Sequence, residues 1–254
     1  MSEDYDPRIT PVRDDLAAAV LEGVLERPRY VEGVRKQVAA AALPLRFAAS
    51  GQARLETELL RGEGFTVYDE ADGWAWGQAA GDGYVGWVPA AGLSGEIEIP
   101  SHVVAVPASH LFSEPDLKSP PRARLSLECR VRIVAEDGGF AECAGGGWLF
   151  AKHLAPVAAT APNYIETALG FLGVPYLWGG RTSLGLDCSA LIQLALLRAG
   201  IQAPRDSDQQ ALAVGEAVAA SGTLDDLRAG DLVFFPGHAG IVMEGWRFLH
   251  ANAF

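Results

Sequence analysis

The chain has 254 residues, of which 49% are hydrophobic and 20% charged, so it is long enough for two or three domains that each bury a core. Its formal net charge is −12 at pH 7. A surface this acidic repels phosphate backbones and anionic lipid headgroups, so we expect neither nucleic acid nor a membrane as a partner. The three cysteines are odd in number and widely spaced, which argues against a disulfide framework. Without a CxxC or HExxH motif, no metal site or cofactor is expected.

The N-terminal region, residues 1–37, gives two expectations. It begins MSEDYDPRITPVRDD, which lacks the cationic start and apolar core of a secretory signal peptide. No apolar stretch reaches the ~18 residues that a membrane-spanning helix needs, so we expect a cytoplasmic protein. Between residues 14 and 25, leucines and valines recur at steps of three and four, which predicts a short amphipathic helix.

Residues 38–157 have the texture of small β-barrels, with short alternating runs separated by Gly, Asp, Pro and Ser. A faint internal repeat divides this region into units at 38–99 and 100–157. Each unit has a strand, an Asp-Gly turn, an aromatic strand, a Gly-Trp strand and a short turn into Leu. A short linker over 158–162 follows, and Asn163 is placed to cap a helix.

The most informative stretch is GVPYLWGGRTSLGLDCSAL, residues 173–191. The apolar spacing after Asp187 and the glycine at position 200 predict a helix whose first turn contains Cys188. Unpaired backbone N–H groups and the positive end of the helix dipole favour a thiolate at that position. Because the thiolate is the attacking species, Cys188 is the candidate nucleophile. The alternative, a buried structural thiol, applies better to Cys129 and Cys143, which lie on alternating strands.

A base for this cysteine is expected from the C-terminal hairpin. His238 and His250 begin and end two alternating runs that are separated by Glu244, Gly245 and Trp246. A hairpin centred near residue 244 pairs residues whose numbers sum to about 488, which would set His238 opposite His250 on one face. One imidazole would then act as base, and the other would hold its tautomer and orientation.

Together these motifs resemble the NlpC/P60 cysteine peptidases, with GDLVFFPGHAGIVM and FLHANA supplying the rest of the match over residues 158–254. The repeat resembles a tandem of bacterial SH3 (SH3b) domains. The resemblance implies an α+β architecture: a papain-like peptidase domain behind two SH3b barrels. It also implies a triad of Cys188, His238 and His250, with Tyr176 and the backbone N–H of Cys188 meeting the oxyanion. The chain stops four residues after His250, where the family continues, so we expect a truncated final domain.

The whole arrangement resembles γ-D-glutamyl-L-diamino acid endopeptidases (dipeptidyl-peptidase VI type). That implies hydrolysis of the γ-D-Glu–diamino acid bond in free murein peptides with an unblocked N-terminal L-Ala. Asp206 and Ser207 match positions that receive the substrate amino terminus, and a buried ammonium needs such a carboxylate. Tyr84 would close that end, and the remaining expected substrate contacts are Ser189 and Arg205. Asp206 could instead cap the following helix, and Tyr84 could be a barrel core residue.

Two other functions remain open at this stage. The chain could be a hydrolase of intact peptidoglycan, against which the acidic charge and the missing export signal weigh. It could also be a binding protein whose SH3b units hold a wall peptide beside an inactive peptidase domain. The complete Cys-His-His set argues against that reading.

Overall fold

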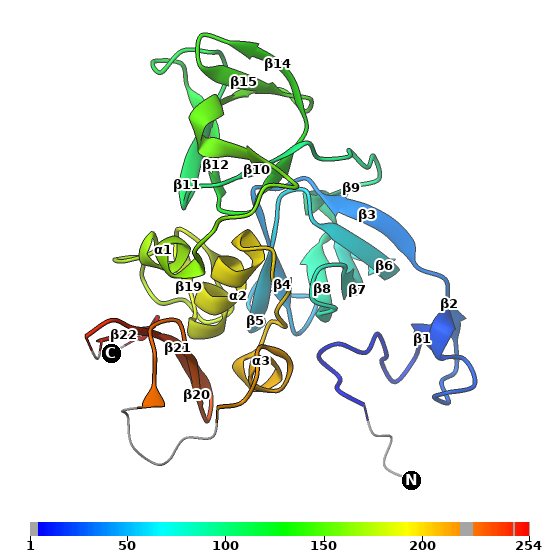
Figure 1. Ribbon diagram of the computed structural model, residues 1–254. Helices are drawn as coiled ribbons and strands as arrows, with labels where there is room; N and C mark the ends of the chain where they lie inside the picture. Colours follow the sequence, from blue (N-terminus) through cyan, green and yellow to red (C-terminus); the bar gives the residue numbers. More distant parts are fainter. Residues whose placement is uncertain (1–4, 219–225, 246, 254) are drawn as a thin grey trace.

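The computed structural model describes residues 5–218, 226–245 and 247–253. Figure 1 shows two β-rich units, drawn in blue to cyan and in green, beside a yellow-to-red unit that mixes helices and strands. This is the α+β class that the sequence predicts. Within the described ranges, no helix has both the length and the apolar character that crossing a lipid bilayer requires.

The segment before the first β unit contains short strands and a turn rather than the expected amphipathic helix. Its elements are β1 (Ala17–Ala18), the 3₁₀ turn η1 (Ala19–Leu21) and β2 (Tyr30–Val31), with β1 and β2 paired in parallel. The helix prediction over 14–25 is wrong because burial does not follow a helical period. Three successive residues, 16–18, are buried, whereas Val20 and Val24 are 80% and 72% exposed. Gly23 then turns the chain with a φ of +79°, a conformation that ends a right-handed helix.

The first β unit is a seven-stranded sheet of order β5-β4-β8-β7-β6-β3-β9. It begins at Val34, before the boundary expected at residue 38. Asp72 and Gly73 form the turn between β6 and β7, both with positive φ, which is the hairpin geometry that an Asp-Gly pair favours. The elements are β3 (Val34–Val38), β4 (Ala42–Arg46), β5 (Leu55–Leu60), β6 (Gly64–Ala71), β7 (Trp74–Ala79), β8 (Val85–Pro89), η2 (Ala90–Gly92) and β9 (Leu93–Ser94).

The second β unit repeats this local plan. Gly138 and Gly139, both with positive φ, form the β14–β15 turn, and the Gly-Trp strand β16 leads through η3 into β17, as β8 leads through η2 into β9. Its assignment to the SH3b class stays a prediction. The elements are β10 (His102–Val104), β11 (Ala108–Phe112), β12 (Pro121–Ser126), β13 (Arg130–Val131), β14 (Ile133–Asp137), β15 (Phe140–Cys143), β16 (Trp148–Phe150), η3 (Ala151–His153) and β17 (Leu154–Pro156).

The third unit contains the α-helices. The side chain of Asn163 accepts a 2.9 Å hydrogen bond from the backbone N–H of Ile165, so the predicted helix cap is confirmed. Three strands in the order β20-β21-β22 form its main sheet. The elements are α1 (Tyr164–Leu169), β18 (Arg181–Thr182), β19 (Gly185–Leu186), α2 (Cys188–Arg198), α3 (Ser207–Ala213), β20 (Leu232–Phe235), β21 (His238–Met243) and β22 (Arg247–Leu249).

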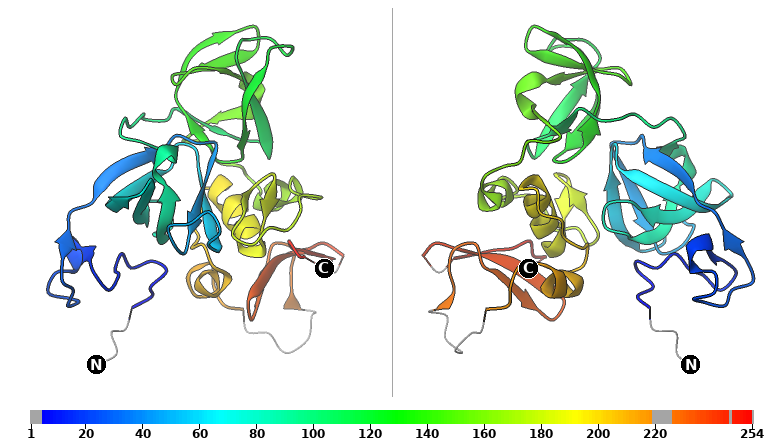
Figure 2. Two further views of the ribbon diagram at one scale, coloured as in Figure 1. Left: turned by 180° about the vertical axis from the view of Figure 1, so that it is seen from behind. Right: turned by 45° about the vertical axis from the view of Figure 1, so that its right-hand side comes forward.

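Both β units pack against the helical unit, as the two views of Figure 2 also show. One continuous apolar core contains Leu125 and Leu149 of the second β unit together with Ile192 and Leu194 of α2. The first β unit is attached by a buried ion pair, in which Arg181 Nη2 lies 3.1 Å from Glu63 Oε1. Glu63 follows β5 and Arg181 lies on β18, so this polar contact joins the end of β5 to the third unit.

Candidate active site

The candidate nucleophile Cys188 is the first residue of α2, as the sequence predicts. Asp187 is the N-cap, and its Oδ1 accepts a 2.8 Å hydrogen bond from the backbone N–H of Ala190. Its other oxygen, Oδ2, accepts from the N–H of Gly179 at 2.9 Å, which ties the glycine turn to the helix start. Nearly all of α2 is buried, so the position of the sulfur is fixed by packing on every side of the helix.

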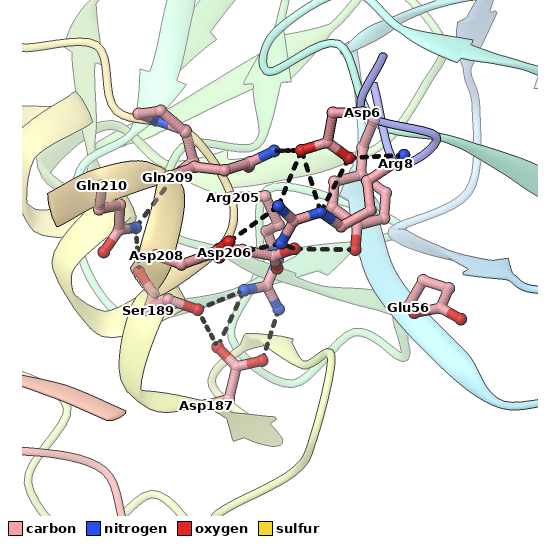
Figure 3. Close-up of polar contacts among 12 residues, drawn as sticks. Asp6, Arg8, Glu56, Asp187, Ser189, Arg205, Asp206, Asp208, Gln209 and Gln210 are labelled. Carbon is pink, nitrogen blue, oxygen red and sulfur yellow. Dashed lines mark hydrogen bonds and ion pairs between the residues drawn. The ribbon is translucent and has the colours of Figure 1, made fainter. Parts of the chain in front are cut away.

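Arg205 stabilises the start of α2 through contacts with Asp187 and Ser189. It is 1% exposed, and its Nη2 lies 2.7 Å from Asp187 Oδ2, while Nη1 donates to Ser189 Oγ at 2.9 Å and Nε donates to Thr57 Oγ1 at 2.7 Å. Figure 3 shows the guanidinium directed at Asp187 and Ser189. Arg205 is not among the residues that line the cavity described next, and its role as a substrate contact stays a prediction.

A cavity of about 380 Å³ opens over Cys188. It brings together six residues expected at the site from three parts of the chain, together with side chains from β5 and from the N-terminal segment. Its lining consists of Arg8, Arg54, Glu56, Tyr84, Tyr176, Trp178, Asp187, Cys188, Ser189, Asp206, Ser207, Asp208 and Gly237.

The pKa of the Cys188 thiol departs from what its position at a helix start alone suggests. Burial raises the pKa of Cys188 above its usual value, and the adjacent Asp187 carboxylate raises it further. Hydrogen bonds from the backbone N–H groups of Ala239, Ser189 and Cys188 itself oppose this shift. The bond from Ala239 also places the start of β21 directly against the sulfur. A base must therefore remove the proton when the sulfur attacks.

The two histidines are joined as expected, but through a different register. His238 Nε2 and His250 Nδ1 lie 2.9 Å apart. The strands pair Ile241 with Leu249 and Met243 with Arg247, a sum of 490 instead of 488, so His250 is diagonal to His238 and follows the end of β22. A shift of two residues keeps side chains on the same face, so the contact survives. Of the expected turn residues, Trp246 lies outside the described residues.

The same contact determines which ring nitrogen of His238 is free. Because Nε2 is engaged by His250, Nδ1 is the atom left for a thiol proton. Burial lowers the pKa of His238 below its usual 6.5, and the neighbouring His250 lowers it further. A neutral imidazole is the form that accepts a proton, so this shift suits a base. Gly237, which lines the cavity, carries the chain into His238.

Asp206 lies at the far end of the cavity. It occupies the N-cap position of α3, yet its side chain makes no capping hydrogen bond, so the capping alternative does not account for the carboxylate. Its Oδ2 accepts instead from Arg8 Nη1 at 2.8 Å and from the Tyr84 hydroxyl at 3.1 Å. Burial raises the pKa of Asp206, while Arg205, Arg8 and Tyr84 lower it. Tyr84 belongs to the core of the first β unit and still reaches the site with its hydroxyl.

Several lining residues were missed by sequence reasoning, among them Trp178, Glu56 and Arg8. Trp178 lies inside the motif around Tyr176 and could have been singled out there. Glu56 is one residue of an alternating strand, and Arg8 lies almost two hundred residues from Asp206 in sequence. For Glu56 and Arg8 the sequence carries no signal, because only the packing of the units brings them to the cavity.

Comparison with known proteins matches two parts of the chain. Residues 45–93 match the bacterial dipeptidyl-peptidase Sh3 domain, and residues 173–253 match the NlpC/P60 family. The crystal structure of an NlpC/P60 family protein from Bacillus cereus ATCC 10987 superposes with a TM-score of 0.71 at 23% identity, covering 86% of this chain and 91% of that one. The chain thus carries an NlpC/P60 domain behind an SH3 domain.

Two curated relatives are similar over parts of their length. The gamma-D-glutamyl-L-lysine dipeptidyl-peptidase of Bacillus subtilis (strain 168) is 31% identical over 188 residues, which are 66% of this chain and 60% of the relative. The dipeptidyl-peptidase 6 of Lysinibacillus sphaericus is 36% identical over 109 residues, 41% of this chain and 38% of the relative. The chain therefore spans less than two thirds of the length of either relative.

Proposed function

We propose that the protein is a cysteine peptidase in which Cys188 is the nucleophile, His238 the general base and His250 the group that orients His238. The observation that carries this proposal is the cavity that Cys188, at the start of α2, shares with the carboxylate of Asp206 and with Gly237, which leads into the His238–His250 pair. An SH3-linked NlpC/P60 domain and relatives named as dipeptidyl-peptidases support the same class of reaction.

The reaction proceeds by acyl transfer. As the Cys188 sulfur forms a bond to the scissile carbonyl carbon, His238 Nδ1 takes the thiol proton, and negative charge moves to the carbonyl oxygen. The backbone N–H of Cys188 and the hydroxyl of Tyr176 are the donors for that oxyanion. Protonated His238 then gives its proton to the departing amine as the C–N bond breaks. A water molecule, deprotonated by His238, releases the acyl group and restores the thiol.

The proposed substrate is a free murein peptide of the form L-Ala-γ-D-Glu-diamino acid. The ammonium of L-Ala is neutralised at the far end of the cavity by Asp206, with Glu56 as a second carboxylate in the same lining. A substrate anchored there presents the γ-D-Glu–diamino acid bond to Cys188, so a dipeptide is released. The names of the two relatives support this choice of bond and of product.

A peptide that is still attached to glycan has its amino terminus in amide linkage and cannot offer an ammonium to Asp206. We therefore favour recycling of released peptides over hydrolysis of intact peptidoglycan. The formal charge of −12 also opposes approach to an anionic cell wall.

The test offers L-Ala-γ-D-Glu-L-Lys with and without an N-acetyl cap and measures release of free lysine. We expect cleavage of the free peptide, at least tenfold weaker cleavage of the capped one by the loss of a charge-assisted contact worth about 1.5–3 kcal/mol, and no lysis of purified sacculi. Cys188→Ala, folded but inactive, is the matched control. Turnover by Cys188→Ala would remove the mechanism, and equal cleavage of both peptides would remove the amino-terminal requirement.

A further inference from the structure

Arg8, in the N-terminal segment, lines the cavity of the candidate active site. Its guanidinium lies among three carboxylates: Nη1 donates to Asp206 Oδ2 at 2.8 Å, Nη2 donates to Asp208 Oδ2 at 2.8 Å, and Nε donates to Asp6 Oδ1 at 3.0 Å. Figure 3 shows this cluster between the N-terminal segment and the start of α3. Nη1 also reaches Asp208 Oδ1 at 2.9 Å and Nη2 reaches Asp6 Oδ2 at 2.8 Å, so all five N–H groups are used.

Because no donor of Arg8 is left over, its guanidinium acts on a ligand through Asp206 and not by direct hydrogen bonding. Asp206 Oδ2 already accepts from both Arg8 and Tyr84. The described residues make no hydrogen bond to Asp206 Oδ1, which is the oxygen left to receive an ammonium. Arg8 is therefore a positioning residue that fixes one oxygen of Asp206 and leaves the other for substrate.

Arg8 is itself held from two sides. Its backbone carbonyl accepts a 2.7 Å hydrogen bond from the N–H of Val85, the first residue of β8. Asp6, its neighbour in the segment, accepts from Gln209 Nε2 of α3 at 3.0 Å. The segment thus connects the first β unit, through the backbone of Arg8, to the helix that Asp206 precedes, through Asp6 and the side chain of Arg8.

The position of Arg8 also gives it a steric role. A second cavity, of about 430 Å³, lies over Trp76 and Trp87 of the first β unit. It shares only part of its lining with the cavity above Cys188, namely Arg8, Arg54, Glu56 and Tyr84. These four residues line both spaces, so their side chains determine where one space ends and the other begins. Arg8 is the one among them that is bound to Asp206 by an ion pair.

We infer that Arg8 is a specificity-determining residue that orients Asp206 toward the substrate ammonium and closes the cavity behind it, so that an acylated amino terminus is refused. This inference rests on the proposed function, since it assigns the end of the same substrate-binding cavity. The first β unit and the N-terminal segment then define where the substrate must begin, while the NlpC/P60 domain supplies the reacting groups.

The two roles of Arg8 can be separated by three substitutions. Arg8→Met keeps a side chain of similar length without charge, Arg8→Ala removes both bulk and charge, and Arg8→Lys keeps the charge with fewer donors. Arg29→Ala is the matched control, because Arg29 belongs to the same segment, is 54% exposed, and lies 3.7 and 3.8 Å from Asp15 and Asp69. Each variant is assayed on free and N-acetylated L-Ala-γ-D-Glu-L-Lys, with the melting temperature measured in parallel.

For the free peptide, we expect Arg8→Met and Arg8→Ala to raise KM about tenfold or more while kcat stays within about threefold, because a ground-state anchor is weakened. Arg8→Lys should be intermediate and Arg29→Ala unchanged. Only Arg8→Ala should cleave the capped peptide faster than the wild type does, since only that change removes side-chain bulk from the lining that the two spaces share.

A pH profile gives a readout that a structural role would not change. Burial already raises the pKa of Asp206, and Arg8 lowers it, so Arg8→Met should shift the acidic rise in KM to higher pH. The charged and titratable groups near Asp206 include Arg205 beside it, Asp208 on α3, Asp6 and Arg8 on the N-terminal segment, Arg54, Glu56 and Tyr84 on the first β unit, and Tyr176, Asp187 and Cys188 across the cavity.

The outcomes distinguish this inference from the proposed function. If the wild-type protein does not cleave the free peptide, the proposed function fails. If the wild type cleaves it but Arg8→Met and Arg8→Lys leave KM within about twofold, or lower kcat in place of raising KM, the role of Arg8 is refuted. A failure of Arg8→Ala to fold leaves the decision to the other two variants.

Discussion

His238 Nε2 and His250 Nδ1 lie 2.9 Å apart although the two residues are not partners in the hairpin register. The register places His250 diagonally across from His238, and the rings meet edge to face with centroids 5.1 Å apart at an interplanar angle of 85°. A diagonal contact of this kind depends on both side-chain rotamers more than a direct cross-strand pair does. His250 is also exposed, because it follows the last residue of β22.

Replacing His250 therefore tests orientation separately from proton transfer. We expect His250→Ala to lower kcat about tenfold to a hundredfold, because His238 remains as base but loses the bond that holds its ring. His238→Ala should lower kcat further, toward the level of Cys188→Ala. The check is steady-state kinetics on the free peptide together with melting temperatures. Equal losses for the two histidine variants would show that His250 does more than orient its neighbour.

The pH dependence follows from two opposed shifts. The pKa of Cys188 is raised and that of His238 is lowered, and each shift favours the neutral form of its side chain. Alkylation of Cys188 by iodoacetamide should be slow at pH 5 to 6 and increase steadily toward pH 9 and above. Rapid labelling at mildly acidic pH would instead reveal a stable thiolate–imidazolium pair, as the helix dipole alone would predict.

The same shift of His238 has a consequence for stability. Its folded pKa lies below the usual value of 6.5, so the unfolded chain binds more protons between the two values. Stability should therefore rise with pH through this window and level off above it. We expect His238→Gln to weaken this part of the pH dependence, measured as the free energy of urea unfolding between pH 5 and 7. An unchanged slope would show that His238 titrates alike in both states.

Much of the site was predictable because it is encoded locally. Cys188 at a helix start and the cap at Asn163 follow from short-range patterns of apolar spacing and capping residues. The prediction of an N-terminal helix was wrong because the period of the apolar residues does not show whether a core is present for their helical face to pack against. The hairpin register differs by two residues from the predicted one because turn geometry sets the register. Since side chains alternate with a period of two, His238 and His250 still lie on the same face.

The electrostatics of the site were less predictable, since they depend on packing between units. The helix dipole favours a thiolate, yet burial and the carboxylate of Asp187 raise the pKa of Cys188. Likewise, the sequence motif predicts a substrate contact for Arg205, whereas its guanidinium binds the Asp187 carboxylate at the start of α2. Neither result follows from neighbours in sequence, because both depend on which charges the tertiary fold buries together.

The buried pair of Arg205 and Asp187 should be costly to break. Arg205→Ala leaves the Asp187 carboxylate without its cation in a buried position, and we expect the free energy of unfolding to fall by about 3–5 kcal/mol. Arg205→Met with Asp187→Asn removes both charges and should cost less than the sum of the two single changes. Urea denaturation of the wild type, Arg205→Met, Asp187→Asn and the double variant measures this coupling. Strict additivity would show that the two side chains do not depend on each other.

Tyr84 joins the core of the first β unit to the substrate end of the cavity, and its two roles can be separated. Tyr84→Phe keeps the buried ring, which is 4% exposed, but removes the hydroxyl that donates to Asp206. We expect KM for the free peptide to rise about threefold to tenfold, from the loss of a hydrogen bond worth about 0.5–1.5 kcal/mol, with kcat and melting temperature nearly unchanged. Tyr84→Ala should instead destabilise the fold by about 3–5 kcal/mol. If Tyr84→Phe leaves KM unaltered, the hydroxyl has no part in presenting Asp206, and the residue is a core tyrosine alone.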